Sequence, residues 1–136
     1  MQAFVSEYAV NELKDSGNGS LLASLAEAAF LTAVEKNSDI VQMACYAPLF
    51  TNANDRCWNP DAIVFNSWQQ YGTPSYWMQT FFPPKPLQIV NFGPHAVNLT
   101  IRTNGLQAGV NTTGSRVTVL TSSNVMKENS FSNPNN

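Results

Sequence analysis

Glu7 is the first side chain in the sequence whose type and position fit a catalytic role. It follows the apolar residues 3–5, which are typical of a short buried strand, so its carboxylate lies where that strand is expected to end. Two interpretations are open. In one, the strand simply reaches water at this point. In the other, Glu7 is a reactive group at the carboxyl end of a strand in a parallel α/β fold, where such folds place their catalytic residues.

A second group of polar and aromatic residues follows a second apolar segment, residues 62–65. Asn66 and Gln70 carry amides that can hydrogen-bond sugar hydroxyls, and Trp68 carries an indole ring that can stack on a sugar. The amides could equally cap the turn that follows the strand. If both strands belong to one parallel sheet, their carboxyl ends meet at the same edge, which favours a functional role for Glu7.

Helix and strand patterns alternate through the first part of the chain. Ser20 can cap a helix rich in Leu and Ala over residues 21–36. Residues 39–50 are predicted to form a second helix, which the proline near its end must stop or kink. A Thr-Pro pair at residues 73–74 predicts the start of a further helix. The resulting order indicates two consecutive units of a parallel α/β architecture, joined by predicted loops (residues 10–19 and 51–61).

The pattern becomes β after residue 83. Residues 87–92 and 96–103 alternate apolar and polar side chains around a Gly-Pro turn and predict a hairpin, and residues 116–122 predict a third strand. Their apolar faces need a partner sheet or the preceding helices to cover them. The polar tail, from residue 127 on, is expected to be loose.

The composition argues against several classes of function. Only 12% of the 136 residues are charged and the net charge is −2, so no basic excess is available to neutralise nucleic-acid phosphates. No apolar run approaches the roughly 20 residues that a membrane-spanning helix needs, and the N-terminus lacks the pattern of a signal peptide. No metal site is expected, because His95 is the single histidine. Cys45 and Cys57 could form one bridge, but a free buried thiol is favoured for Cys45.

The other carboxylates carry no motif of their own. They are interpreted as solvated residues of helices and loops (Asp15, Glu27, Glu35, Asp39, Asp55 and Asp61). Three glycosylation sequons, which begin at Asn18, Asn98 and Asn111, are compatible with a secreted glycoprotein.

Four long stretches of sequence carry a resemblance to a known family. They are VSEYAV, LLASLAEAAFLTAVEKNSDIVQMACYAPLF, RCWNPDAIVFNSWQQYGTPSYWMQTFF and the series AVNLTI, GLQAGVN and TVLTSSNVM. Together they resemble the C-terminal part of plant α-L-arabinofuranosidases, which are retaining enzymes of glycoside hydrolase family 51. The resemblance covers nearly the whole chain.

The resemblance implies a fold and an activity. Residues 1–82 would be the C-terminal part of a catalytic (β/α)₈ barrel, residues 83–126 an incomplete jelly-roll-like β-sandwich, and residues 127–136 a flexible tail. The implied activity is hydrolysis of terminal α-L-arabinofuranosides in cell-wall polysaccharides such as arabinoxylan and arabinan, outside the cell or in the wall. The implied nucleophile is Glu7, and no cofactor or metal is needed. The candidates for substrate binding are Asn66, Gln70 and Trp68.

The sequence also departs from that family. Retaining hydrolysis needs a second carboxyl group about 5–5.5 Å from the nucleophile. The family's acid/base glutamate lies in an Asn-Glu motif on an earlier strand, whereas Asn11-Glu12 of this chain lies in a polar loop after Glu7. A barrel takes roughly 250 residues, so most of its strands are missing, and the join after the last helix is shortened. We therefore expect the chain to be inactive alone.

Two alternatives to catalysis are retained. One is a non-catalytic carbohydrate-binding remnant, which would use Trp68 and other aromatic residues near the strand ends. The aromatic residues of the helix after Thr73, such as Trp77, can equally be its buried face. The other alternative is an interaction fragment that docks onto a full-length homologue through uncovered strands.

Overall fold

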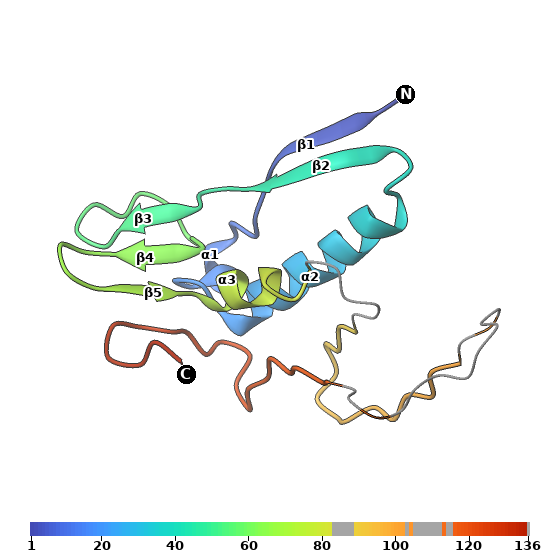
Figure 1. Cartoon of the computed structure of the whole chain (residues 1–136). Coiled ribbons are helices and arrows are strands. Elements are labelled where there is room, and N and C mark those ends of the chain that lie inside the picture. Colours follow the sequence, from blue (N-terminus) through green and yellow to red (C-terminus); the bar gives the residue numbers. More distant parts are fainter. Residues whose placement is uncertain (83–88, 103, 105–112, 114–115, 136) are drawn as a thin grey trace.

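The computed structural model describes residues 1–82, 89–102, 104, 113 and 116–135 (Figure 1). The chain begins with a parallel β-α-β unit, in which strand β1 (Ala3–Tyr8) pairs with strand β2 (Val41–Tyr46). A short helix, α1 (Leu13–Ser16), and a long one, α2 (Leu21–Lys36), connect the two strands. This unit confirms one of the two parallel strand-and-helix units that the sequence predicts.

Helix α2 begins where the sequence predicts. The Ser20 backbone is extended, and its hydroxyl accepts a hydrogen bond of 3.2 Å from the Ala23 N–H, which satisfies one of the free donors of the first turn. Lys36 lies in the last turn, where a positive charge favours the helix dipole. The buried face of α2 is mostly small and apolar, so other elements can approach its backbone closely (Leu21, Ala23, Ser24, Glu27 and Ala28).

The helix predicted for residues 39–50 is wrong. This segment forms β2 and then β3 (Phe50–Asn52). Helix α2 has already ended at Asn37, whose carbonyl accepts from the Val41 N–H at 2.8 Å and turns the chain back. Short apolar segments have no periodicity that separates a strand from a helix. Pairing with β1 therefore decides the conformation.

A second sheet contains three short strands in the order β3-β4-β5, with β4 (Ile63–Phe65) at its centre. Strand β4 is parallel to β3 and antiparallel to β5 (Gln70–Gly72). The strand predicted at residues 62–65 is confirmed, whereas β3 and β5 lie in segments that carry no strand prediction. Helix α3 (Pro74–Gln79) follows β5 and packs against α2, with the predicted Thr-Pro pair at its start.

The strands β1 and β4 lie in different sheets. Figure 1 shows β2 leading into β3 along nearly the same line, with β1 beside β2 and β4 beside β3. A shared edge for the ends of the two predicted strands requires both strands to belong to one parallel sheet. The structure corrects the expectation of a shared edge, because Glu7 belongs to β1 of the first sheet, whereas residues 66–70 lie at the turn between β4 and β5 of the second.

The strands predicted in the second part of the chain are not formed in its described residues. Residues 89–102 and 116–122 contain no strand, and their apolar side chains are largely exposed. A strand of this length needs neighbours on its edges and a covered face, and the described residues provide neither here. The remaining residues of these segments, 87–88 and 103, lie outside the described part. The boundaries given for a β-sandwich at residues 83–126 stay a prediction.

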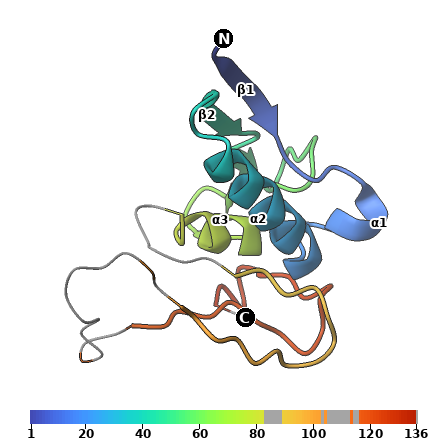
Figure 2. The ribbon, with the colours of Figure 1, turned by 90° about the vertical axis from the view of Figure 1, so that its right-hand side faces the viewer.

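The tail differs from the expected loose segment, because it packs against the first helices (Figure 2). The carbonyls of Val125 and Lys127 accept from the Leu22 and Leu21 N–H groups at 2.7 and 3.0 Å. The Asn129 side chain is buried and donates to the Gly72 carbonyl at 2.9 Å. The Phe131 ring lies edge-on to the Tyr71 ring, with 5.0 Å between the ring centres. The Glu128 carboxylate accepts a hydrogen bond of 2.6 Å from the Asn18 N–H. Long-range partners thus order a segment whose composition is polar.

Candidate functional site

Glu7 lies near the carboxyl end of β1, with its side chain exposed. The strand continues to Tyr8 and is longer than the apolar run 3–5 indicates. Between the pairs Val5–Ala44 and Tyr8–Tyr46, β1 advances three residues while β2 advances two. Glu7 therefore lies in a β-bulge, a feature that redirects side chains and is common beside active sites.

The residue after Glu7 holds this strand end against its neighbours. The Tyr8 ring lies 5.2 Å from the Phe30 ring of α2 and 5.5 Å, edge-on, from the Tyr46 ring of β2. The side chains of Glu7 and Tyr8 thus have different surroundings, since one is exposed and the other is partly buried between a helix and a strand. The Glu7 carboxylate is accessible from solvent, and the Tyr8 ring next to it attaches the strand end to α2 and β2.

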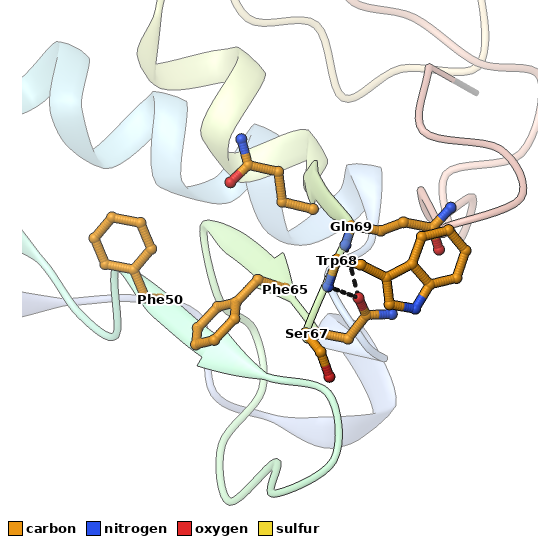
Figure 3. A pocket seen from close by; sticks show the side chains of 7 residues that line it. Phe50, Phe65, Ser67, Trp68 and Gln69 are labelled. Carbon is orange, nitrogen blue, oxygen red and sulfur yellow. Dashed lines mark hydrogen bonds between the residues drawn. The ribbon is translucent and has the colours of Figure 1, made fainter.

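Asn66 holds the turn between β4 and β5. Its side-chain oxygen accepts from the backbone N–H groups of Trp68 at 3.0 Å and Gln69 at 2.7 Å (Figure 3). Of the two interpretations of the Asn66 amide, the structure supports a turn cap. The turn joins two strands, however, and not a strand and a helix.

The other two candidates lie around the same turn. Trp68 is 79% exposed and Gln70 is also exposed. They line an open hollow of about 450 Å³ together with Phe50, Phe65, Asn66, Ser67 and Gln69. In Figure 3 the rings of Phe50 and Phe65 lie on one side of the turn and the indole ring of Trp68 on the other. The hollow combines aromatic faces with amide and hydroxyl groups, which are the side chains that contact sugars.

Sequence reasoning missed the burial of Glu27. The interpretation of this residue as a solvated helix carboxylate is wrong, because only 2% of it is exposed. Its Oε1 atom accepts a hydrogen bond of 3.2 Å from the Val10 N–H, just beyond β1. Burial raises the pKa of the Glu27 carboxyl from 4.5 to about 7, and nearby hydrogen-bonding groups of Ser75, Val10 and Tyr46 offset part of this effect. The sequence did contain a sign of this burial, because Leu and Ala residues surround Glu27 on both sides.

Asp61 is also fully buried, which corrects its interpretation as a solvated loop residue. It forms an ion pair with Arg56, with 3.0 Å between Oδ2 and the guanidinium. Burial raises the pKa of the Asp61 carboxyl, although the charge of Arg56 acts in the opposite direction. Arg56 also donates to the Asn18 carbonyl at 2.7 Å and so connects the β3–β4 loop to the segment before α2. This pair therefore joins two segments that are distant in the sequence.

Other features of the described residues bear on function. Cys45 and Cys57 are both free thiols, and Cys45 is partly buried. The described residues contain no cluster of three or more His, Cys, Asp or Glu side chains that could hold a metal ion. Within the same part of the chain, no helix is long and apolar enough to cross a membrane.

Comparisons with known proteins identify relatives of the chain. The family model described as the α-L-arabinofuranosidase C-terminal domain matches residues 6–86. α-L-Arabinofuranosidases 1 and 2 of Arabidopsis thaliana are 52% and 50% identical over 166 residues, which cover 98% of this chain and 24% of each relative. An extracellular exo-α-L-arabinofuranosidase of Streptomyces chartreusis is 36% identical over 81 residues, 60% of this chain and 9% of the relative.

The chain therefore spans about a quarter of the length of the plant relatives. These alignments run over 166 positions, more than the 136 residues of the chain, so the relatives contain residues that have no counterpart here. That difference agrees with a shortened join in this sequence.

A solved structure supports the same assignment. Arabinose-bound MgGH51 α-L-arabinofuranosidase superposes with a TM-score of 0.54 and 30% sequence identity, covering 60% of this chain and 15% of that chain. The family model matches more than half of the chain and includes Glu7 and the 66–70 turn. The chain belongs to the α-L-arabinofuranosidase C-terminal domain family.

Proposed function

We propose that this chain is the part of a retaining α-L-arabinofuranosidase that carries the catalytic nucleophile, Glu7. The observation that carries the proposal is the exposed carboxylate of Glu7 in a bulge at the carboxyl end of a parallel strand, within the segment that matches the family. Reactive groups in α/β barrels occupy that position. We further propose that the β1-α2-β2 unit and α3 are the last units of such a barrel.

In this mechanism Glu7 attacks the anomeric carbon of a terminal arabinofuranoside and forms a covalent glycosyl-enzyme. A second carboxyl group protonates the leaving oxygen and then activates the water that releases the sugar. We propose that this second group comes from residues outside this sequence, and that the chain alone does not turn over. The substrates would be arabinose-containing wall polysaccharides such as arabinoxylan and arabinan, and the location would be extracellular.

An activated substrate tests the nucleophile without the missing acid. Dinitrophenyl α-L-arabinofuranoside has a leaving group that departs without protonation, so Glu7 alone can form the covalent adduct. We expect one equivalent of dinitrophenolate per chain and a mass increase of one pentosyl group on Glu7. Glu7→Gln should give neither signal, whereas the matched control Glu12→Gln should behave as the wild type. No adduct in the wild type, or an adduct at another residue, would refute the proposal.

The hollow around the β4–β5 turn supports a second candidate function, carbohydrate binding without catalysis. Trp68 is largely exposed and lines the hollow together with two further aromatic residues, while Asn66 holds the turn that presents it. Titration with arabinan oligosaccharides, followed by tryptophan fluorescence, tests this function. Trp68→Ala should abolish the response, and Trp77→Ala, which alters an indole that is 39% exposed on α3, should retain it. Equal affinity of both variants would contradict sugar binding at the hollow.

We also propose that a full-length homologue is a partner of this chain. Among the described residues, strand β1 pairs on one edge only, with β2, and Phe4 and Met43 on these strands are more than half exposed. Parallel sheets are normally covered on both faces. Co-purification of the chain with an intact arabinofuranosidase, reduced by Phe4→Lys, would support this partner. Absence of any complex at micromolar concentrations would count against it.

A further inference from the structure

Glu27 is the largest fully buried side chain among the described residues, and the proposed catalytic step does not use it. Burying a carboxyl group in a protein interior is costly unless its oxygens find partners. A residue with such a cost in a helix otherwise rich in Leu and Ala needs a local explanation. Its neighbours supply one, because they come from the elements that surround the end of β1.

The two oxygens of Glu27 face different elements. Oε1 accepts from the Val10 N–H at 3.2 Å, which ties the chain just after β1 to α2. Within the described part of the chain, Oε2 has no hydrogen-bond partner, and neither do the buried hydroxyls of Tyr46 on β2 and Ser75 on α3. Both hydroxyls are close enough to favour the charged carboxyl, although neither forms a hydrogen bond of good geometry. One carboxyl group thus meets three elements.

The charge of the same carboxyl group also acts on Tyr8, the residue that follows Glu7. Burial raises the pKa of the Tyr8 phenol, and the negative charge of Glu27 is the next largest cause of that rise. The Tyr8 ring in turn contacts Phe30 and Tyr46. The bulge that contains Glu7 is therefore followed by two successive attachments: the Tyr8 ring between α2 and β2, and the Val10 N–H on Glu27.

We propose that Glu27 is a positioning residue for Glu7, an inference that rests on the proposed function. Its carboxyl group ties the chain after β1 to α2 through the Val10 N–H, so that the exposed carboxylate of the bulge keeps one orientation. A bulge interrupts the ladder and leaves the strand end with fewer backbone hydrogen bonds to hold it. Side-chain anchors beyond the bulge replace that support.

Substitutions at Glu27 separate positioning from simple stabilisation. Glu27→Met has similar size and lacks the oxygen that accepts from Val10, whereas Glu27→Gln keeps a carbonyl oxygen for that bond. Glu35→Met is the matched control, because it removes an exposed carboxylate from the same helix. The readouts are the rate of pentosyl transfer to Glu7 from the dinitrophenyl substrate, per folded chain, and the hydrogen exchange of the Val10 amide.

We expect Glu27→Met to slow the transfer on the order of 10- to 100-fold, since small displacements of a reacting group have effects of that size. It should also expose the Val10 amide to faster exchange, while Glu27→Gln restores most of the rate and Glu35→Met leaves it unchanged. A folded Glu27→Met that transfers at the wild-type rate would overturn the proposal. If Glu27→Met does not fold, Val10→Pro removes the other partner of the same hydrogen bond, and a wild-type rate in that variant overturns the proposal as well.

The outcome also separates this inference from the proposed function. If the wild type forms no adduct, Glu7 is not the nucleophile and the proposed function fails. The contact between Glu27 and Val10 is then tested by the hydrogen exchange of the Val10 amide alone. An unchanged exchange rate in Glu27→Met would show that Glu27 does not hold the end of β1. If the wild type forms the adduct and every variant does so equally, only the positioning role fails.

Discussion

Raising the pH through the neutral range is expected to destabilise the fold through Glu27. The pKa of this buried carboxyl is about 7, against 4.5 for a solvated glutamate. Because the folded chain holds the proton more tightly than the unfolded chain does, the free energy of unfolding falls as the pH rises between these two values. The contribution of the protonated group is complete below pH 4.5 and is lost as the pH passes 7.

The size of the effect follows from the difference between the two pKa values. At about 1.4 kcal/mol for each pKa unit, the free energy of unfolding should fall by about 3 kcal/mol. For a domain whose total stability is roughly 5–15 kcal/mol, that is a large fraction. Asp61 changes stability in the same direction, since burial raises its pKa too, although the charge of Arg56 acts against that rise.

Urea unfolding, followed by tryptophan fluorescence at a series of pH values, measures this dependence. Glu27→Gln removes the titrating group, so its stability relative to the wild type should rise by about 3 kcal/mol from pH 4.5 to pH 8. The matched variant Glu35→Gln alters an exposed carboxylate of the same helix and should keep the wild-type slope. Parallel curves for the wild type and Glu27→Gln would refute the reasoning.

Three further predictions concern groups that hold the fold around the candidate site. Ser20→Ala should cost about 1 kcal/mol in urea unfolding, because it removes the cap of α2. Asn66→Ala should cost about 1–2 kcal/mol by leaving two turn N–H groups without their acceptor, whereas Ser67→Ala next to it should be neutral. Arg56→Met should cost about 3–5 kcal/mol at pH 7, since it leaves Asp61 charged and buried, and less at pH 4; an equal loss at both pH values would contradict this.

The sequence by itself determined the elements that depend on local signals. Helix α2 begins at Ser20 because a serine hydroxyl before a run of helix formers satisfies a free N–H group, which is a matter of neighbouring residues. Helix α3 follows the Thr-Pro pair for a similarly local reason, the fixed φ of proline. The motif around Glu7 could likewise be recognised from consecutive residues, and the family match includes it.

The tertiary structure alone decided where side chains and short strands find their partners. Residues 41–46 form a strand because β1 pairs with them, and nothing within the segment distinguishes it from a helix. The tail packs because Asn129 and Phe131 meet β5, more than fifty residues earlier in the chain. The burial of Glu27 depends in the same way on β1, β2 and α3 converging on one helix face. The burial of a side chain depends on contacts with residues that are distant in the sequence. A carboxylate in a predicted helix is therefore expected to be solvated unless those contacts are known.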